Sequence, residues 1–401
     1  MSEVSISYDP LTPGYFADPY PHYAQLREQN PVHQTRFGFW LVTRYVDVVA
    51  GYRHPQLSRN TRLWEHFETW RRGSADGPLE QAMANWLVMI DPPRHTPLRE
   101  IHLLAFSGQR LAAAGPVIDR LVAELLAPAR AAGGCDLVAD VAERLPVYLV
   151  NQLLAIPRAD WEPFVAWSKA IAQCSEAQLT TKVLQAGREA LEQLSGYFRP
   201  LIRQRRAEPG GDLLSALATG DADGQRLTDQ ELLDSLVFLY QAGHPTSTHL
   251  ITLAVHSLLH HPAELARLQA DRSLIPGAVE ELQRFDGPVQ MNDRVALVDL
   301  DLSGHRIRKG ELVRLCLGSA NRDSAFVPDG DRLDLSRAST GQLGYGHGLH
   351  HCVGEALGRM QARAALAGLL AQAPGLRWGE GKVRYLPSTS NRGLRTLPVE
   401  F

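Results

Sequence analysis

Residues 343–360 read LGYGHGLHHCVGEALGRM, and this stretch decides how the rest of the chain is interpreted. Glycines occupy alternate positions at Gly344, Gly346 and Gly348, Cys352 follows, and a helix-forming run comes next. We expect a tight loop that leads into a helix, because glycine permits backbone conformations that other residues avoid. A thiol at a helix N-terminus lies near unpaired N–H groups and the positive end of the helix dipole, which favour the thiolate. Cys352 is therefore predicted to be a nucleophile or a metal ligand.

Two nucleotide-binding motifs are excluded by spacing. A dinucleotide-binding loop would need glycine at Leu349 or His351, and no strand with a following acidic residue supports it. A phosphate-binding loop is also absent, since GEGKV around Lys382 lacks the upstream glycine and the following hydroxyl.

A zinc site is an alternative that the residues leave open. Its ligands would be His347, His350, His351 and Cys352. No second Cys/His pair at zinc-finger spacing completes such a site.

The composition limits the class of protein. The 401 residues are 44% hydrophobic and 21% charged, which predicts a folded chain with a sizeable core. Four scattered cysteines are too few for a disulfide scaffold and indicate a reducing compartment. The net charge of −3 offers no global attraction to nucleic acid or to an anionic membrane. With no secretory signal pattern and no long apolar segment, we expect a cytoplasmic protein that binds neither.

Periodicity predicts a mainly α fold with small β-sheets (α+β). Apolar residues recur three and four apart through residues 91–270, and a last long helix is expected over about 353–373. Short alternating runs predict strands around Gly38, within 288–313 and in the tail after about residue 375. Because no repeat or linker divides the chain, we expect one domain over residues 1–401.

The loop matches a known family. Residues 345–354, YGHGLHHCVG, resemble the haem-binding signature of the cytochromes P450, Phe-Gly-x-Gly-x-His-x-Cys-x-Gly, with Tyr345 in place of the phenylalanine. The resemblance implies the cytochrome P450 fold, with haem b between a long distal helix and the helix after the loop. It also implies that Cys352 is the axial thiolate of the iron, a ligand that favours O–O cleavage. Gly346 and Gly354 would then let the backbone approach the porphyrin.

Further elements match the family at the expected distances. Glu281 and Arg284 in AVEELQRF stand three apart, as in the family's Glu-x-x-Arg pair, and Arg332 is the expected third member of this structural cluster. The family pattern also implies four residues that bind the haem propionates. These are His95, Arg99, Arg294 and His350.

The distal helix departs from the family pattern. Ala-Gly-x-(Asp/Glu)-Thr corresponds here to Ala242, Gly243, His244, Pro245 and Thr246, so proline replaces the acid. The small residues would leave room for O₂, and the threonine hydroxyl would hydrogen-bond it. Without the acid, protons could come through anchored water or a polar group of the substrate, or peroxide could bypass the relay. A tolerated proline in an ordinary hydroxylase remains a further interpretation.

The expected substrate is a hydrophobic, aromatic natural product, because flat apolar side chains suit ring stacking. In the family that this chain resembles, the segment before the Asp91 helix covers the distal haem face. The contact residues that the resemblance implies are Trp64, Trp86, Met89, Phe238, Leu239, Val289, Met291 and Ser388. The predicted reaction is an O₂-dependent oxidation, including oxidative C–C or C–N coupling. An ordinary hydroxylating monooxygenase and a non-catalytic haem sensor are the alternatives.

The electrons for this reaction are expected to come from NAD(P)H through a ferredoxin reductase and a ferredoxin. Arg359 and Arg363 on the last helix are candidates for the surface that meets this redox partner.

Overall fold

The computed structural model describes residues 6–70, 77–106, 108–176, 179–338 and 341–401. The chain divides into two compact units, each assembled from segments that are far apart in the sequence. Unit 1 comprises Met1–Trp70, Leu253–Cys352 and Arg384–Arg395, and unit 2 comprises Arg71–Thr252, Val353–Val383 and Thr396–Phe401. The expectation of a single domain therefore stays a prediction.

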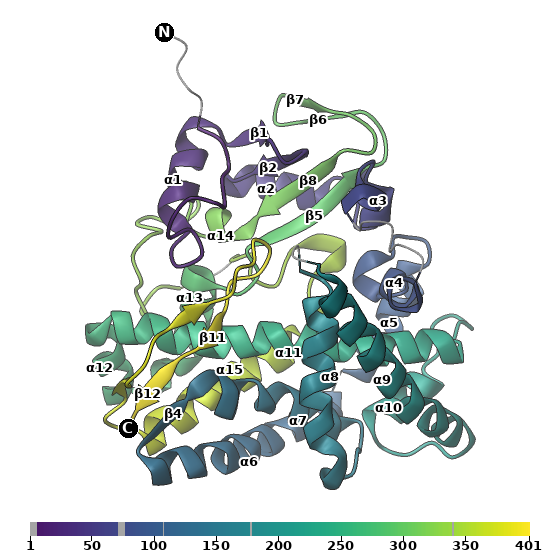
Figure 1. Cartoon of the computed structure of the whole chain (residues 1–401), viewed down its shortest axis with the longest axis vertical. Helices are drawn as coiled ribbons and strands as arrows, with labels where there is room; N and C mark the ends of the chain where they lie inside the picture. Colours follow the sequence, from purple (N-terminus) through teal and green to yellow (C-terminus); the bar gives the residue numbers. More distant parts are fainter. Residues whose placement is uncertain (1–5, 71–76, 107, 177–178, 339–340) are drawn as a thin grey trace. The chain divides into compact units, whose positions relative to one another are not determined.

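Unit 1 is built on a five-stranded sheet of order β1-β2-β8-β5-β3 (Figure 1). Its strands are β1 (Val32–Gln34), β2 (Phe39–Val42), β3 (Leu57–Ser58), β5 (Met291–Ala296) and β8 (Leu312–Cys316). The first two form the predicted antiparallel pair, and Gly38 supplies the left-handed φ of +79° in their turn. β8 pairs parallel to β2 and antiparallel to β5, so the N-terminal strands are joined to a hairpin from much later in the chain.

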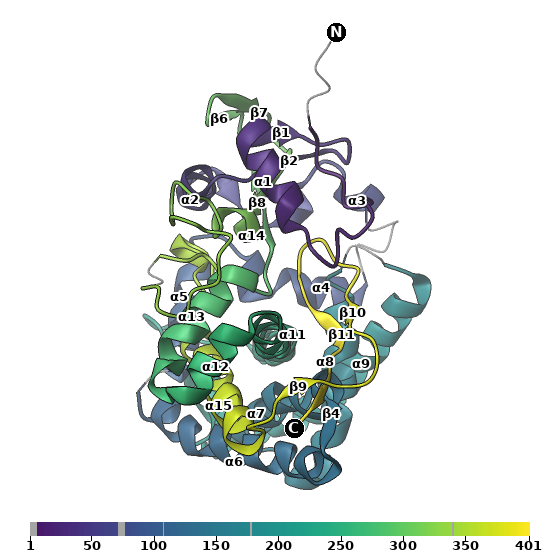
Figure 2. The ribbon, with the colours of Figure 1, turned by 90° about the vertical axis from the view of Figure 1, so that its left-hand side faces the viewer.

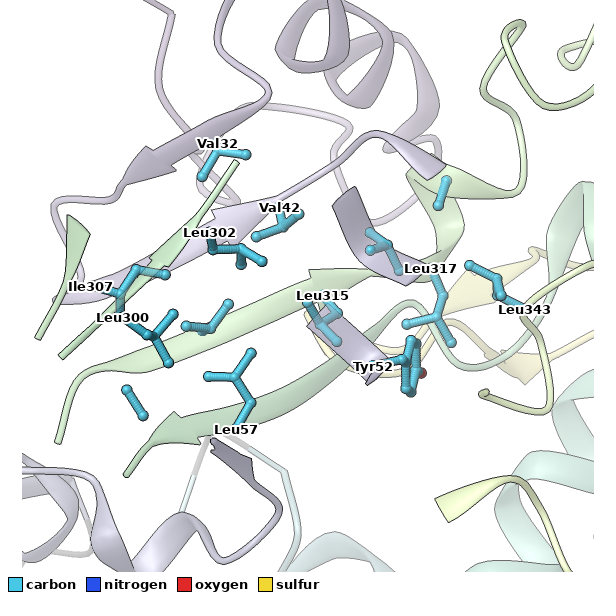
Figure 3. Close-up of a cluster of buried hydrophobic side chains, with 14 residues drawn as sticks. Val32, Val42, Tyr52, Leu57, Leu300, Leu302, Ile307, Leu315, Leu317 and Leu343 are labelled. Carbon is cyan, nitrogen blue, oxygen red and sulfur yellow. The ribbon is translucent and has the colours of Figure 1, made fainter. Parts of the chain in front are cut away.

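Alternation along β8 buries both faces of this sheet. Val313 and Leu315 belong to the apolar cluster drawn in Figure 3, which also contains Tyr52 from the helix α2 (Tyr45–Arg53). Leu312 and Cys316 belong to a second cluster, which includes the aromatic side chains of the helix α1 (Tyr20–Gln29). Each face of the sheet is therefore covered by helix side chains.

The other elements of unit 1 are short. The helices and helical turns are η1 (Thr61–Leu63), α3 (Phe67–Trp70), α12 (Pro262–Ala270), η5 (Arg272–Leu274), α13 (Ile275–Asp286), α14 (Leu317–Ala320) and η6 (Gly348–His350). The strands are β6 (Leu300–Leu302), which pairs with β7 (His305–Ile307), and β10 (Arg384–Tyr385), which pairs with β11 (Leu394–Thr396).

Unit 2 is mainly helical, as the periodicity predicts. Its helices and helical turns are α4 (Pro78–Ala84), η2 (Leu87–Met89), α5 (His95–Ala105), α6 (Gly108–Ala132), η3 (Val138–Ala142), α7 (Arg144–Leu153), η4 (Arg158–Asp160), α8 (Trp161–Gln173), α9 (Thr181–Ala207), α10 (Leu213–Thr219) and α15 (Glu355–Gln372). A small sheet of order β4-β12-β9 joins β4 (Gly134–Asp136), β12 (Pro398–Glu400) and β9 (Arg377–Trp378). The prediction of a mainly α fold with small sheets is confirmed.

Two helices of unit 2 approach each other closely at a glycine. An ideal Cβ on Gly368 in α15 would lie 2.4 Å from a side-chain carbon of Val122 in α6. No larger residue fits at this position, so the last helix is seated directly against α6.

The longest helix is α11 (Asp229–His260), which Figure 2 views along its axis. It runs through Pro245 without interruption, and its residues from Leu253 onward belong to unit 1. Within the residues that the structure describes, no helix combines the length and the apolar character needed to cross a membrane.

Candidate functional site

Glycine shapes the loop that carries Cys352. Gly346 and Gly348 have φ values of +75° and +71°, a region that residues with side chains rarely adopt. Gly344 is required for a different reason, since a Cβ there would lie 2.2 Å from Nε2 of Gln283. The three alternate glycines therefore combine two left-handed turns with one close approach.

Backbone hydrogen bonds close the loop on itself. The N–H of Cys352 donates to the carbonyl of Tyr345 at 2.9 Å, and the N–H of Gly346 donates to the carbonyl of Leu343 at 2.8 Å. The N–H of Leu343 itself donates to Oδ1 of Asn321 at 2.7 Å. These bonds fix the position from which the cysteine side chain emerges.

Cys352 differs from the other three cysteines in exposure. Its side chain is exposed, whereas Cys174 and Cys316 are buried and Cys135 is half-buried. Burial raises the pKa of Cys135 and that of Cys316 to about 12, which keeps both as thiols. Cys352 is thus the accessible thiol of this chain.

The aromatic ring of Tyr52 in α2 lies beside this loop, a position that no motif in the sequence predicts. Its hydroxyl accepts a hydrogen bond from Nδ2 of Asn292 at 2.6 Å, and the guanidinium carbon of Arg294 lies 4.8 Å from its ring centroid. A Cβ on Gly346 would come within 3.7 Å of the same hydroxyl. One tyrosine therefore brings the predicted Arg294 to the cysteine loop.

The four residues predicted to bind propionates fall into two pairs. Arg294 and His350 belong to unit 1, and Arg294 is buried. His95 and Arg99 belong to unit 2, where they stand one turn apart at the start of α5, with His95 fully buried. The helix begins at His95, whose N–H donates to the carbonyl of Asp91 at 3.1 Å.

The predicted pair of Glu281 and Arg284 forms in α13, with side chains 0% and 1% exposed. Nε and a terminal nitrogen of Arg284 donate to the two carboxylate oxygens at 2.7 and 2.8 Å. A fork of two charge-assisted bonds suits a buried pair.

The prediction for Arg332 is wrong in one respect. Nε of Arg337, not the side chain of Arg332, lies 3.3 Å from Oε1 of Glu281. The Arg332 side chain pairs with Asp334, and only its backbone carbonyl accepts from Arg284, at 3.2 Å. Arg284 also donates to the carbonyl of Asn321 at 2.9 Å, so the cluster supports the residue that anchors the cysteine loop.

Several residues of α11 form a half-buried stripe, which we call the front face. Spacings of three and four residues place them on one side of the helix, whereas most of their neighbours are buried. A Cβ on Gly243 would meet no described atom of the same unit within 4 Å. The residues of the stripe are Phe238, Leu239, Ala242, Gly243 and Thr246.

Two polar groups lie on this face: the hydroxyl of Thr246 and the carbonyl of Gln241, which Pro245 cannot bond. The Thr246 hydroxyl donates to the carbonyl of Ala242 at 2.7 Å, so its oxygen remains able to accept. Pro245 is half-buried and has no N–H with which to bond the carbonyl of Gln241.

The opposite side of α11 is fixed by a buried polar network. Nδ1 of His244 lies 2.8 Å from Oγ of Ser168 in α8, which donates to the carbonyl of Tyr240 at 3.1 Å. The Tyr240 hydroxyl donates to Asn151 in α7 at 2.6 Å. Burial lowers the pKa of His244 to about 3, so this imidazole is neutral.

The predicted substrate residues of unit 2 gather near the first half of α11. Trp86 is 2% exposed, and its ring centroid lies 5.6 Å from that of Phe238. Met89 in η2 and Leu239 are half-buried. Trp86 therefore packs against the ring of Phe238 and presents almost no exposed surface of its own.

The predicted substrate residues of unit 1 are mostly structural in their contacts. Met291 is buried in the apolar core of the sheet and Trp64 packs against that core, so we no longer expect Met291 to touch a substrate. Val289 packs against the other cluster and bridges to Asn391. Ser388 Oγ accepts the N–H of Asn391 at 3.0 Å.

The loop that contains Ser388 is held firmly within unit 1. Nε of Arg392 lies 2.5 Å from Oδ1 of Asp286, and its terminal nitrogens donate to the carbonyls of Phe16 and Ala17. The Tyr385 hydroxyl lies 3.0 Å from Nε2 of His256. The hairpin β10–β11 is thereby tied to α13, to α11 and to the N-terminal segment.

The donor set of unit 1 fits a haem group. It offers an exposed sulfur for iron, on a loop closed by its own backbone hydrogen bonds, together with a buried arginine suited to a carboxylate. The zinc alternative finds no support, since no group of three or more His, Cys, Asp or Glu side chains able to hold a metal occurs in the described ranges.

The two arginines predicted to meet a redox partner are partly engaged elsewhere. Arg359 pairs with Glu355 one turn earlier in α15, and both side chains are about three-quarters buried. Arg363 is half-buried.

Comparison with known proteins gives a consistent result. A family model described as "Cytochrome P450" matches residues 174–372. The cytochrome P450 monooxygenase PikC of Streptomyces venezuelae is 36% identical, over 96% of this chain and 92% of its own. The mycinamicin IV hydroxylase/epoxidase of Micromonospora griseorubida is 38% identical, over 94% of each chain. The crystal structure of CalO2 superposes with a TM-score of 0.91 at 33% identity and covers 98% of both chains.

Proposed function

Because this chain belongs to the cytochrome P450 family, we propose that it oxidises a hydrophobic secondary metabolite with O₂, using haem b held by Cys352 and electrons from NAD(P)H. Its identification as a bacterial-type cytochrome P450, its fold and its monooxygenase activity are confirmed by the relatives described above. The substrate, the exact product and the redox partner are the parts that we propose.

One observation carries the assignment of the metal ligand. Cys352 is the exposed thiol of the chain and emerges from a loop with two left-handed glycines, directly before α15. A sulfur in this position gains from the nearby helix N-terminus and needs no rearrangement of the buried core.

The haem, when bound, supplies O₂ binding and reductive activation at its iron. Cys352 would ligate the iron, and Arg294, His350, His95 and Arg99 would bind its carboxylates. Thr246 would accept a hydrogen bond at the front face of α11, because its own proton is donated to Ala242.

Insertion of oxygen into a C–H or C=C bond is the reaction that we favour. The relatives bear the names monooxygenase and hydroxylase/epoxidase, and nothing specifically supports C–C or C–N coupling. A non-catalytic haem sensor is not favoured for the same reason. Coupling is kept as an outcome of the experiment below.

The substrate would lie along the front face of α11. Phe238 and Leu239 present apolar surface there, and Gly243 leaves space beside the helix. Trp86 would act from behind by fixing the ring of Phe238. We propose a ferredoxin and its reductase as the electron donors.

The haem assignment is tested by adding CO to the reduced, purified protein. A strongly red-shifted Soret band is expected for a thiolate ligand, and an imidazole-like band would overturn the assignment of Cys352.

The reaction is tested by turnover of candidate metabolites under ¹⁸O₂. Products with one ¹⁸O atom support oxygen insertion. Products without the label but with a new C–C or C–N bond would replace insertion by coupling.

A further inference from the structure

The front face of α11 ends at a histidine that the family pattern does not include. His249 follows Thr246 by three residues and Pro245 by four, so the three share one side of the helix. The side chain is 8% exposed, whereas Thr246 and Pro245 are half-buried. The imidazole therefore lies where the open stripe meets the core of unit 2.

One ring nitrogen of His249 lacks a hydrogen-bond partner among the described residues. Nδ1 is buried and makes no hydrogen bond within the part of the chain that the structure describes. A buried polar group without a hydrogen bond costs free energy unless a ligand or water supplies one.

Two more polar groups on the same stretch have incomplete hydrogen bonding. Thr246 donates its only hydroxyl proton to the carbonyl of Ala242, so it can accept a bond but has no proton left to donate. The carbonyl of Gln241 receives no bond from Pro245, which has no N–H. A group that both donates and accepts is missing between them, and a neutral imidazole has that property.

Burial, with a smaller contribution from a nearby positive charge, lowers the pKa of His249 and keeps the ring neutral. Burial lowers the pKa of His249 to about 4, and the positive charge of Lys169 in α8 acts in the same direction. His244 on the same helix also carries a lowered pKa, about 3. Lys169 itself is paired with Glu143, its Nζ lying 2.5 Å from Oε1 of that side chain.

We propose that His249 is the positioning residue that holds a water molecule against Thr246, in the place where Pro245 provides no acid. The neutral ring holds this water through Nδ1 and itself undergoes no net change of protonation. The water donates one hydrogen bond to Thr246 Oγ1 and forms a second hydrogen bond with Nδ1 of His249. This inference rests on the proposed function, because it concerns the same face of α11.

His244 does not compete for this role. It lies on the opposite side of α11, and its Nδ1 is bonded to Ser168. It is therefore a matched control: a second buried, neutral histidine on the same helix, engaged in packing.

The experiment compares the parent holoenzyme with His249→Phe, His249→Gln and His244→Gln. The first readout is the C–O stretching frequency of the reduced CO complex, which reports hydrogen bonding on the distal face without turnover. The second is the fraction of consumed NAD(P)H that appears in product rather than in hydrogen peroxide.

We expect His249→Phe to shift the C–O stretch and to lower the product fraction about tenfold. This is less than the roughly 10²–10⁴-fold for loss of a direct proton donor, because His249 acts through the water that it holds. His249→Gln should restore most of both, because its amide donates and accepts. His244→Gln should lower the melting temperature and leave the C–O stretch at its parental value.

A parental C–O stretch and product fraction in His249→Phe would overturn the inference. Should that variant not fold, His249→Leu against His249→Gln gives the same comparison. Absence of a thiolate-type CO band in the parent would instead overturn the proposed function, so the two failures are distinguishable.

Discussion

The Cys352 loop is held by its own backbone, whereas the front face of α11 is positioned by side chains on the opposite face of the helix. In the loop, glycines and main-chain bonds fix every turn, and Gly344 leaves no room for a methyl group. In α11 the backbone is a regular helix, and Tyr240 and His244 anchor it from behind. The loop therefore tolerates few substitutions. The front face accepts different side chains without loss of the helix, as the proline at position 245 shows.

Replacement of the sulfur is the largest change to the loop side. Cys352→Ser should lose the thiolate-type CO band and reduce turnover to background, because an alcohol does not replace the thiolate as an iron ligand. Spectra and product formation measure this. Cys135→Ser is the control, and equal losses in both variants would contradict the special role of Cys352.

Removal of the buried support of the loop should come next. Arg284→Ala removes the bidentate partner of the buried Glu281, leaves it only the longer contact with Arg337, and should cost about 3–5 kcal/mol of unfolding free energy. Urea denaturation of the holoenzyme measures this. Arg337→Ala should cost less and Arg332→Ala least, since the Arg332 side chain is exposed. A larger loss for Arg332→Ala than for Arg337→Ala would restore the original prediction.

A single methyl group tests the packing of the loop. Gly344→Ala should destabilise the protein by about 1–3 kcal/mol, because the new Cβ meets the Gln283 side chain. Gly277→Ala in α13 meets no described atom within 4 Å and is the control. Equal melting temperatures for both variants would show that the loop has room to adjust.

The front face is tested by restoring the missing acid. Pro245→Glu should change the ratio of product to hydrogen peroxide several-fold while haem binding is retained, because a carboxylate offers a second proton path. Pro128→Glu removes another proline from a helix interior, in α6, and is the control. If the ratio is the same in all three proteins, Pro245 has no part in proton delivery.

The buried histidines of α11 predict a modest pH dependence of stability. The pKa of His244 is lowered to about 3 and that of His249 to about 4, below the usual 6.5, so the unfolded chain takes up protons first. Stability should therefore fall as the pH drops below 6.5, by about 1 kcal/mol per histidine at pH 5.5. His244→Gln should flatten the curve of unfolding free energy against pH, and an unchanged slope would contradict this assignment.

The sequence predicted best where a local pattern specifies the structure. The glycine spacing before Cys352 and the three-residue spacing of Glu281 and Arg284 each describe one turn of chain, and both arrangements are present. The strands around Gly38 were equally local, because a turn glycine joined two alternating runs.

Predictions that depend on three-dimensional packing were less successful. Arg332 and Arg337 lie five apart in irregular chain, where no periodicity tells which side chain turns inward. Met291 begins β5, and the pairing of β5 with β8 decides which of its side chains enter the core. The burial of Met291 therefore could not be predicted from the sequence. The part played by Tyr52 depends on a contact across almost 300 residues, for which a single sequence has no signal.

The position of Tyr52 has a consequence for how this chain could be shortened. Its ring connects the cysteine loop with Arg294, yet it belongs to a helix near the N-terminus. A polypeptide that starts after α2 would retain Cys352 and every glycine around it, and would lose the ring that these residues rest on. The smallest cofactor-binding fragment therefore needs the N-terminal segment as well, and expression of the two pieces together is the way to rebuild it.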